Sequence, residues 1–392
     1  MPRERYVVSK FGSESVTKGH PDIVCDMIAA SILDHAIKSS AIFGKRPRVA
    51  IEAAAKGDLE KGGYLALLGE VTLPTHVQLD YLQAAREAIR FAGYTDPSLG
   101  FYDGLQDTRV KITQQSNDIN IGVSREKVGA GDQGIMFGGA IKGEAPELMP
   151  MPIMIAHALT ARLTDVRESG ILQGLRPDGK SQVVVGYDSR GRPISVEKVT
   201  LAASHDPTYP LRQLYADLTR EVIEPVLDSF HFGLPRNKED VIVNGTGRFI
   251  NCGPTADAGV TNRKIIVNTY GGVFPHGGGG LNGKDGTKVD VAGAVFARFV
   301  AKTLVANGFA DKVQINIGYT IGQPEPDFIN IETFGTEKYP LKMIQNIVKR
   351  TFDFSVQGII DQLDLFRPIY TDLAAGQWMG KHGAPCEQTP SI

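Results

Sequence analysis

The sequence predicts an α+β fold of three similar units, each with helices on one face of a mostly antiparallel sheet. A pattern of helix, strand pair and helix recurs three times along the 392 residues, at a regular offset of roughly 130 residues. Each strand pair is joined by a short turn segment, as in an antiparallel hairpin. The α-β-β-α order is common, so chance similarity is the alternative, but the regular offset of all four elements favours a true repeat.

The helices are predicted from apolar residues at helical spacing and from signals at their ends. Pro21 suits the first position of the first helix, which makes His20 its N-cap, and Gly308 ends the helix that opens the third unit. The strands are predicted from alternation, which is clear at Val313 and Ile315. The predicted helices are 22–37, 77–92, 153–166, 211–230, 289–307 and 341–365, and the predicted strand pairs are 48–54 with 64–71, 182–187 with 194–201, and 313–321 with 328–333.

The boundaries between the units are predicted near Asn120 and Gly253. They give an N-terminal domain over 1–120, a central domain over 121–252 and a C-terminal domain over 253–392. The segment 121–134 is rich in glycine and charge, so it is expected to be a mobile loop, either a lid or a linker. The tail from Gly380 looks irregular and is expected to be loosely held. The sheet faces that the helices leave open must be buried by the other units or by a second chain.

Composition excludes several classes of protein. Lys and Arg number 42 against 44 Asp and Glu, a formal net charge of -2, which gives no electrostatic signal for nucleic acid or an anionic membrane. No apolar stretch is long enough to span a bilayer, and the first residues lack the apolar core of a secretory signal. The three cysteines are far apart and suit neither a disulfide framework nor a metal motif, so a cytoplasmic location is expected.

The segment 276–290, HGGGGLNGKDGTKVD, carries the strongest functional signal. Its glycines let backbone N–H groups approach a ligand closely. Lys284 and Lys288 add point charges where a helix is predicted to begin, and Asp290 is a hard ligand of the kind that Mg²⁺ uses beside phosphate. The segment therefore indicates a site for a polyphosphate with its metal. The alternative is a flexible loop in which Thr287 and Asp290 only cap the helix.

Two familiar nucleotide motifs nearly match, and both are rejected. The pattern G-x4-G-K at 278–284 is followed by Asp285, where a P-loop needs Ser or Thr. The pattern G-x-G-x-x-G at 129–134 does not follow a core strand, so a dinucleotide-binding fold is excluded as well.

Other polar side chains could join this site. His20 and Asp22 bracket the start of the first helix, where an anion is favoured. Lys180 begins a strand of the second unit, and Arg263 and Lys264 precede an apolar strand that leads to the glycine-rich segment. Each has an ordinary explanation too, as a helix cap or as surface charge.

Two acidic residues lie in the first predicted hairpin. Glu52 and Glu70 stand amid apolar residues, one in each strand. A carboxylate at such a place is costly unless it is paired or bound to a metal.

These segments together closely resemble those of the S-adenosylmethionine synthases, also called methionine adenosyltransferases. The matching segments are GHPD at 19–22, GAGDQGIMFG at 129–138, LRPDGKSQV at 175–183, RKIIVNTYGG at 263–272, FGTEKYP at 334–340 and the glycine-rich segment 276–290. The resemblance covers nearly the whole chain in collinear order. It implies three α+β domains related by pseudo-threefold symmetry, with flat sheet faces packed between the subunits of a homodimer or a dimer of dimers and active sites at the dimer interface.

The resemblance also implies the reaction and the residues that carry it. Methionine sulfur attacks C5′ of ATP, and the released tripolyphosphate is hydrolysed to pyrophosphate and phosphate. The implied ATP-binding positions are Asp178 and Phe249 on the adenosine side and, around the phosphates, the catalytic His20, Lys180, Arg263, Lys264, Lys284 and Lys288. The implied methionine-binding positions are Glu70, Gln115, Asp132 and Asp257. The implied metal ligands are Asp22 and Asp290 for two Mg²⁺ ions and Glu52 for K⁺.

The chain departs from the family's usual pattern at Ile23, Asn268 and Val291 and in a shorter 121–128 loop, while every implied metal and phosphate group remains. Two other functions are weighed against this one. A Mg²⁺-dependent polyphosphate hydrolase would leave methionine positions such as Glu70 without a role. A catalytically silent paralogue would have lost one of the implied phosphate or metal groups.

Overall fold

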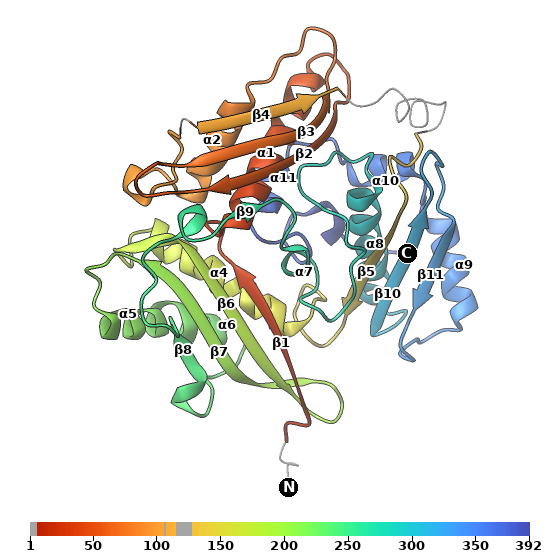
Figure 1. Cartoon of the computed structure of the whole chain (residues 1–392). Helices are drawn as coiled ribbons and strands as arrows, with labels where there is room; N and C mark the ends of the chain where they lie inside the picture. The colour runs from red at the N-terminus through yellow and green to blue at the C-terminus, as the bar shows by residue number, and fades with distance from the viewer. Residues whose placement is uncertain (1–5, 106, 115–127) are drawn as a thin grey trace.

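The computed structural model describes residues 6–105, 107–114 and 128–392, and its elements confirm the α+β class (Figure 1). Within these residues the strands form three sheets. In spatial order, the first sheet contains β4 (Asp107–Thr113), β3 (Tyr64–Thr72), β2 (Arg48–Lys56) and β9 (Gly259–Val260). The second contains β1 (Ser9–Val16), β6 (Leu175–Tyr187), β7 (Pro193–His205) and β8 (Val241–Val243). The third contains β11 (Phe328–Glu332), β10 (Lys312–Tyr319) and β5 (Gly134–Ile141).

Each sheet receives one edge strand from a distant part of the chain. Strand β1, at the start of the chain, pairs with β6 of the second sheet, and β5 pairs with β10 of the third. Strand β9 closes the cycle because it pairs with β2 of the first sheet. All of these pairs are antiparallel, whereas β3 with β4 and β7 with β8 are parallel. The three sheets are therefore tied to one another through the backbone.

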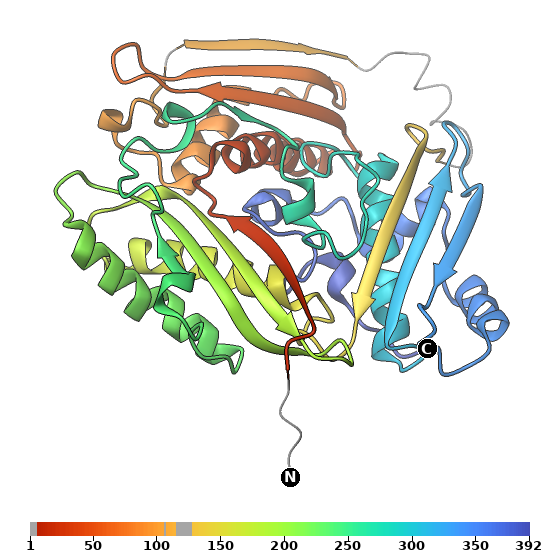
Figure 2. The same ribbon diagram turned by 60° about the horizontal axis from the view of Figure 1, so that its bottom comes forward.

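One long helix packs against each sheet. Helix α1 contacts β2, α4 contacts β1 and β6, and α8 contacts β5 and β10. Figure 2 shows the three sheets arranged around a central group of helices. The helices are α1 (Pro21–Ala41), α2 (Tyr81–Ala92), α4 (Met151–Glu168), α5 (Leu211–Leu218), α6 (Glu224–Ser229), α7 (Ile265–Asn268), α8 (Val289–Ala306), α9 (Leu341–Thr351), α10 (Val356–Leu363) and α11 (Tyr370–Ala374). Among the described residues, no helix is both long and apolar enough to cross a membrane.

The central helices are buried on nearly all sides. Ile23, Ile28 and Ile32 of α1 and Phe296 and Val300 of α8 are completely buried. A helix that is apolar all round belongs in a core rather than at a surface, and these two helices form the centre of the molecule.

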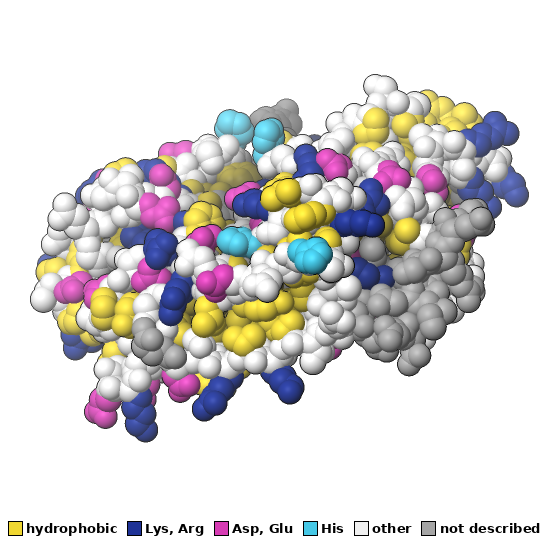
Figure 3. All heavy atoms as spheres, turned by 90° about the horizontal axis from the view of Figure 1, so that it is seen from above, with side chains coloured by type: hydrophobic (Ala, Val, Ile, Leu, Met, Phe, Trp, Pro, Cys, Tyr) yellow, Lys and Arg dark blue, Asp and Glu magenta, His cyan; other side chains and the backbone are white. Residues whose placement is uncertain are grey.

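The sheets leave their other faces open. Leu68 on β3 and Ile135 on β5 remain about half exposed on the side away from the helices. A space-filling view shows apolar side chains gathered among basic and acidic ones on one face of the molecule (Figure 3). These open faces match the expectation that the helices cover only one side of each sheet.

Two predicted helices are interrupted. The helix predicted over 211–230 contains a π-helical segment, Thr219–Ile223, just before Pro225, which lacks the N–H that a regular helix requires. The helix predicted over 341–365 is two helices, α9 and α10. Ser355 begins the second one, because its side chain accepts a hydrogen bond from the Gly358 N–H.

Several local predictions were wrong. The apolar strand predicted after Lys264 is the short helix α7, because a run of three apolar residues does not distinguish strand from helix. The capping role considered for Thr287 and Asp290 is absent: Lys288 is the N-cap of α8, without a side-chain bond. Strands β1, β4, β5, β8 and β9 were not predicted.

The C-terminal tail is held firmly rather than loosely. The Glu387 carboxylate is buried and accepts hydrogen bonds from Arg298 at 2.8 and 2.9 Å and from Lys302 at 2.7 Å. Arg298 is fully buried and also donates to three backbone carbonyls, including Gly139 of β5. Burial opposes the charge, but Arg298 and Lys302 lower the pKa of Glu387 to about 2. This ion pair attaches the tail to α8.

Candidate functional site

A first cluster of charged side chains lies at the N-terminus of α1. His20 is the N-cap, as predicted, and its Nδ1 accepts a hydrogen bond from the Asp22 N–H at 3.2 Å. Asp22 is almost completely buried, and its Oδ2 accepts from Lys264 Nζ at 2.6 Å. Its Oδ1 accepts from the Val260 N–H at 3.0 Å and lies 3.6 Å from Arg263. Residues 20 and 22 thus meet residues 260–264 although they are far apart in sequence.

The pairing of β1 with β6 brings Lys180 to this cluster. Lys180 stands opposite Val16 in the register, and the chain then runs directly from β1 to His20. Gly19 is required at the crossing, because a side chain there would come within 2.3 Å of the Pro177 carbonyl oxygen. The Lys180 ammonium is about half exposed and lies 3.7 Å from Glu14, so it faces solvent.

The surroundings of His20 favour the neutral form of its ring. Burial, and then the charge of Lys264, lower the pKa of His20 to about 4, with a further contribution from Lys180. Because Nδ1 accepts the Asp22 N–H, the single proton of the neutral ring belongs on Nε2. The neutral ring is a hydrogen-bond donor through Nε2, and it lies among the cations Lys264 and Lys180 and the carboxylates Asp22 and Asp257.

Three further predicted residues lie near or beside this cluster. Asp178 is buried, and its Oδ2 accepts the Gly253 N–H at 2.8 Å; burial raises the pKa of Asp178 to about 7. Asp257 is exposed, and its charge acts on both His20 and Asp178. Phe249 is partly buried, and the backbone N–H of Phe249 donates to a ring nitrogen of His205.

A second cluster lies where the glycine-rich segment runs along β2. Lys284 Nζ donates to Asp290 Oδ2 at 2.7 Å, and both side chains are about one fifth exposed. The backbone at Lys284 bridges to Ala50. A side chain at Gly279 would lie 2.2 Å from Asp290 Oδ1, so the glycine there gives the backbone room to pass the carboxylate.

Asp285 anchors this segment, although no sequence motif assigns it a functional role. Its side chain is fully buried and accepts the Val49 N–H at 2.7 Å, the Thr287 N–H at 2.8 Å and Lys288 Nζ at 3.2 Å. Burial opposes its charge, but Lys288 and these hydrogen bonds hold the pKa of Asp285 below its ordinary value. Lys288 is thereby fixed beside Asp285.

The remaining predicted residues border the second cluster or fall outside the described residues. Glu52 and Glu70 are exposed on the open face of β2 and β3, and Glu52 lies beside Lys284. Asp132 is exposed in the turn before β5. Gln115 and residues 121–127 of the predicted lid lie outside the part of the chain that the structure describes.

Among the described residues, no hydrogen bond or ion pair directly joins the charged side chains of one cluster to those of the other. Residues that sequence reasoning did not assign to the site lie between them: the Asn262 N–H donates to Asp26 Oδ1 at 2.6 Å, and Asn262 exchanges two hydrogen bonds with Asn282 at 2.9 and 3.1 Å. Asp26 is completely buried, which raises the pKa of Asp26 to about 8. The i, i+4 spacing of Asp22 and Asp26 was the one available signal, because it places both on one face of α1.

The carboxylates could each contribute to a metal site but do not form a closed one. Among the described residues, no three His, Cys, Asp or Glu side chains converge as a ready-made metal cage. Asp22 and Asp290 each hold one lysine ammonium instead, at 2.6 and 2.7 Å. Mg²⁺ commonly takes one or two carboxylates together with phosphate oxygens and water, so single carboxylates beside cationic groups fit a metal that arrives with a polyphosphate.

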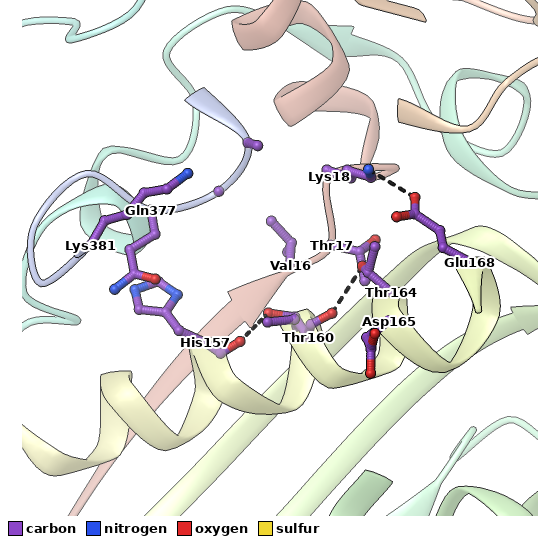
Figure 4. A pocket seen from close by; sticks show the side chains of 13 residues that line it. Val16, Thr17, Lys18, His157, Thr160, Thr164, Asp165, Glu168, Gln377 and Lys381 are labelled. Atoms are coloured by element: carbon purple, nitrogen blue, oxygen red, sulfur yellow. Dashed lines mark hydrogen bonds and ion pairs between the residues drawn. The ribbon is translucent and has the colours of Figure 1, made fainter. Parts of the chain in front are cut away.

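A separate cavity of about 350 Å³ lies between the end of β1, one face of α4 and residues 375–381 (Figure 4). None of the predicted site residues lines it. Its charged side chains already have partners: Lys18 pairs with Glu168 at 2.8 Å, and Lys381 pairs with Asp372 at 2.9 Å. The cavity is therefore distinct from both clusters.

Comparison with known proteins gives a consistent result along the chain. Family models described as the N-terminal, central and C-terminal domains of S-adenosylmethionine synthetase match residues 9–117, 127–249 and 251–388. An S-adenosylmethionine synthase of Thermus thermophilus is 42% identical over 393 residues, covering 97% of this chain and 96% of that protein. S-adenosylmethionine synthase 1 of Rhodospirillum rubrum is 43% identical over 383 residues, with the same coverage.

Proposed function

Because the chain belongs to the S-adenosylmethionine synthetase family, we propose that its two charged clusters are the two halves of an active site for adenosyl transfer. The chain is an enzyme that makes S-adenosylmethionine, and the family implies ATP and methionine as its substrates. The observation that carries the proposal is the arrangement at the start of α1, where His20 Nδ1 accepts the Asp22 N–H and the Asp22 carboxylate pairs with Lys264 at 2.6 Å. We infer attack of the methionine sulfur on C5′ of ATP, followed by hydrolysis of the tripolyphosphate to pyrophosphate and phosphate.

The chemistry requires both alignment and neutralisation of charge. A thioether is a weak, uncharged nucleophile, so the sulfur must be held in line with C5′ and the departing oxygen. That oxygen gains negative charge as its bond to C5′ breaks. A donor already pointed at it stabilises the transition state without reorganisation. His20 Nε2 is suited to this role, while Lys180, Arg263 and Lys264 bind the rest of the phosphate chain.

The second cluster supplies the complementary groups. Lys284 and Lys288 would contact the phosphate chain from the other side. Asp22 in the first cluster and Asp290 in the second would each hold one Mg²⁺, and Glu52 would hold K⁺. Such ions, when bound, neutralise phosphate charge. The lysines that occupy Asp22 and Asp290 in this structure would then turn toward the phosphates.

Other residues would position the two substrates. Asp178, held by the Gly253 N–H, and Phe249 would face the adenosine. Glu70, Gln115, Asp132 and Asp257 would surround methionine. These positions include several carboxylates, which suit the ammonium group of an amino acid.

We further propose that a second copy of the chain completes each site. The halves are separated within one chain by the buried Asp26 and Asn262, and the open sheet faces present apolar side chains such as Leu68 and Ile135. A homodimer, or a dimer of dimers, would bury these faces. The cyclic exchange of β1, β5 and β9 supports three domains with pseudo-threefold symmetry and boundaries near Asn120 and Gly253. The buried, free cysteines suit a cytoplasmic location.

The proposal is tested by product analysis. The purified protein is supplied with ATP, Mg²⁺, K⁺ and L-methionine, and the products are identified by mass spectrometry. We expect S-adenosylmethionine, pyrophosphate and phosphate in equal amounts. Release of phosphate from ATP at the same rate without methionine would indicate a polyphosphate hydrolase instead.

A further inference from the structure

Arg48 is an incompletely paired cation next to the second cluster. It begins β2 and, by the alternation of the strand, lies on the same face as Ala50 and Glu52. Its Nε and Nη2 are inaccessible to solvent and make no hydrogen bond. An arginine normally satisfies its donors when they are buried, so two unused donors on one guanidinium require an explanation.

Asp285 does not satisfy Arg48. It is the carboxylate whose charge acts on Arg48, but its two oxygens already accept hydrogen bonds from Val49, Thr287 and Lys288. Arg48 and Lys288 together carry two positive charges against the single negative charge of Asp285. An excess charge in a largely buried place is costly, and an anionic ligand would offset it.

The free side of Arg48 faces the GAGDQG turn. A side chain at Gly131 would lie 3.8 Å from Arg48 Nη2 and 3.2 Å from Lys288 Cδ, so the three residues converge. The next residue, Asp132, is exposed and is a proposed methionine-binding position. The Arg48 guanidinium thus lies against Gly131, and the Asp132 carboxylate belongs to the next residue of the same turn.

We propose that Arg48 binds the α-carboxylate of the amino-acid substrate, with Lys288 beside it, while Asp132 receives the ammonium group. An α-amino acid is a zwitterion, so its recognition needs one cationic and one anionic group a few ångströms apart. The guanidinium fork matches a carboxylate and can donate two parallel hydrogen bonds. A phosphate oxygen is the other oxyanion available, but the first cluster, Lys284 and Lys288 already supply cations for the phosphates. This inference rests on the proposed function.

The test compares three variants. Arg48→Met removes the charge and keeps much of the volume, Arg48→Lys keeps the charge without the fork, and Arg46→Met is the matched control. Arg46 is two residues away, about half exposed and paired with Asp361. We expect Arg48→Met to raise the KM for methionine on the order of 10-fold to 100-fold, the range for a hydrogen bond to a charged group. Arg48→Lys should recover part of this loss, and Arg46→Met should behave as the parent.

A substrate analogue separates substrate contact from a structural role. L-Methioninamide keeps the ammonium group and the sulfur but lacks the carboxylate charge. Its inhibition constant should be the same for the parent and Arg48→Met, whereas the KM for methionine should differ. Equal weakening of both compounds would assign Arg48 a structural role, and an unchanged KM for methionine would also overturn the proposal. A rise confined to the KM for ATP or for inorganic tripolyphosphate would place a phosphate there instead.

Stability gives an independent readout. Because Arg48 is an incompletely compensated charge, Arg48→Met should unfold at the same Tm as the parent or above it. A large loss of Tm would identify Arg48 as the counterion of Asp285.

Calorimetric titration of L-methionine into the parent and Arg48→Met measures the same contact without turnover. If the parent protein binds methionine but forms no S-adenosylmethionine, the proposed reaction is refuted. The titration still tests the contact between Arg48 and the methionine carboxylate in that case.

Discussion

Replacing Lys284 by alanine should lower turnover by about 10²–10³ and leave the KM for methionine unchanged. The Lys284 ammonium is partly buried and only about one fifth of the side chain is exposed. For such a group an effective dielectric constant near 20 applies, and a unit charge about 4 Å away is then worth about 4 kcal/mol. Each 1.36 kcal/mol of barrier corresponds to about a tenfold change in rate, so about 10³ is the upper limit. Asp290, at 2.7 Å, offsets part of that charge and accounts for the lower figure.

The assay measures S-adenosylmethionine formation at saturating ATP, Mg²⁺ and methionine. Lys338→Ala is the matched control, because Lys338 forms an equally short pair with Asp311, at 2.6 Å, but both side chains are about half exposed. An exposed pair is worth about 0–1 kcal/mol, and it lies outside both clusters, so its loss should leave turnover unchanged. Near-normal turnover of Lys284→Ala, or an equal loss in both variants, would refute the electrostatic reasoning.

Four further outcomes are expected. Activity should require Mg²⁺ or Mn²⁺ and rise with K⁺. Asp22→Asn or Asp290→Asn should raise the Mg²⁺ concentration that gives the half-maximal rate, and full activity in excess chelator would contradict the metal requirement. Sedimentation at low micromolar concentration should show a dimer or larger assembly, and a stable, active monomer would count against the proposed interface. Glu387→Gln should cost about 3–5 kcal/mol of stability at pH 7. Since the folded pKa of Glu387 is about 2, below its ordinary value, this difference in Tm should shrink as the pH falls from about 5 toward 2, and a constant difference would be inconsistent with the ion pair. If the short 121–128 loop closes less tightly, the ratio of kcat/KM for ethionine to kcat/KM for methionine should be higher than in a long-loop relative assayed alongside. Equal ratios in the two enzymes would argue against looser closure.

Local signals in the sequence were sufficient for much of the helical framework. Pro21 placed the start of α1 and made His20 its N-cap, which the structure confirms. Apolar periodicity located the long central helices, and alternation located the hairpins β2–β3 and β10–β11. These features depend on contacts within a few residues, so a single sequence can reveal them.

Such local signals do not reveal which distant segments of the chain pair with one another. Strand β5 is rich in glycine and was not predicted, yet Gly138 packs so closely on α8 that a side chain there would lie 2.0 Å from the Ala297 backbone. The C-terminal tail looked loose because nothing near Glu387 in the sequence reveals its partner Arg298, 89 residues away. The buried Asp285 and the partly buried Asn262 were missed for the same reason.

The most direct test of the two-halves account is complementation between inactive variants. His20→Ala removes a group of the first cluster and Lys284→Ala a group of the second, and the two chains are co-expressed and purified as a mixture. If each site combines clusters from two chains, half of the random dimers are mixed and each holds one intact site, so the mixture should recover about a quarter of the parental activity. If both clusters of a site come from one chain, every site carries a defect, and the mixture should be no more active than the separate variants.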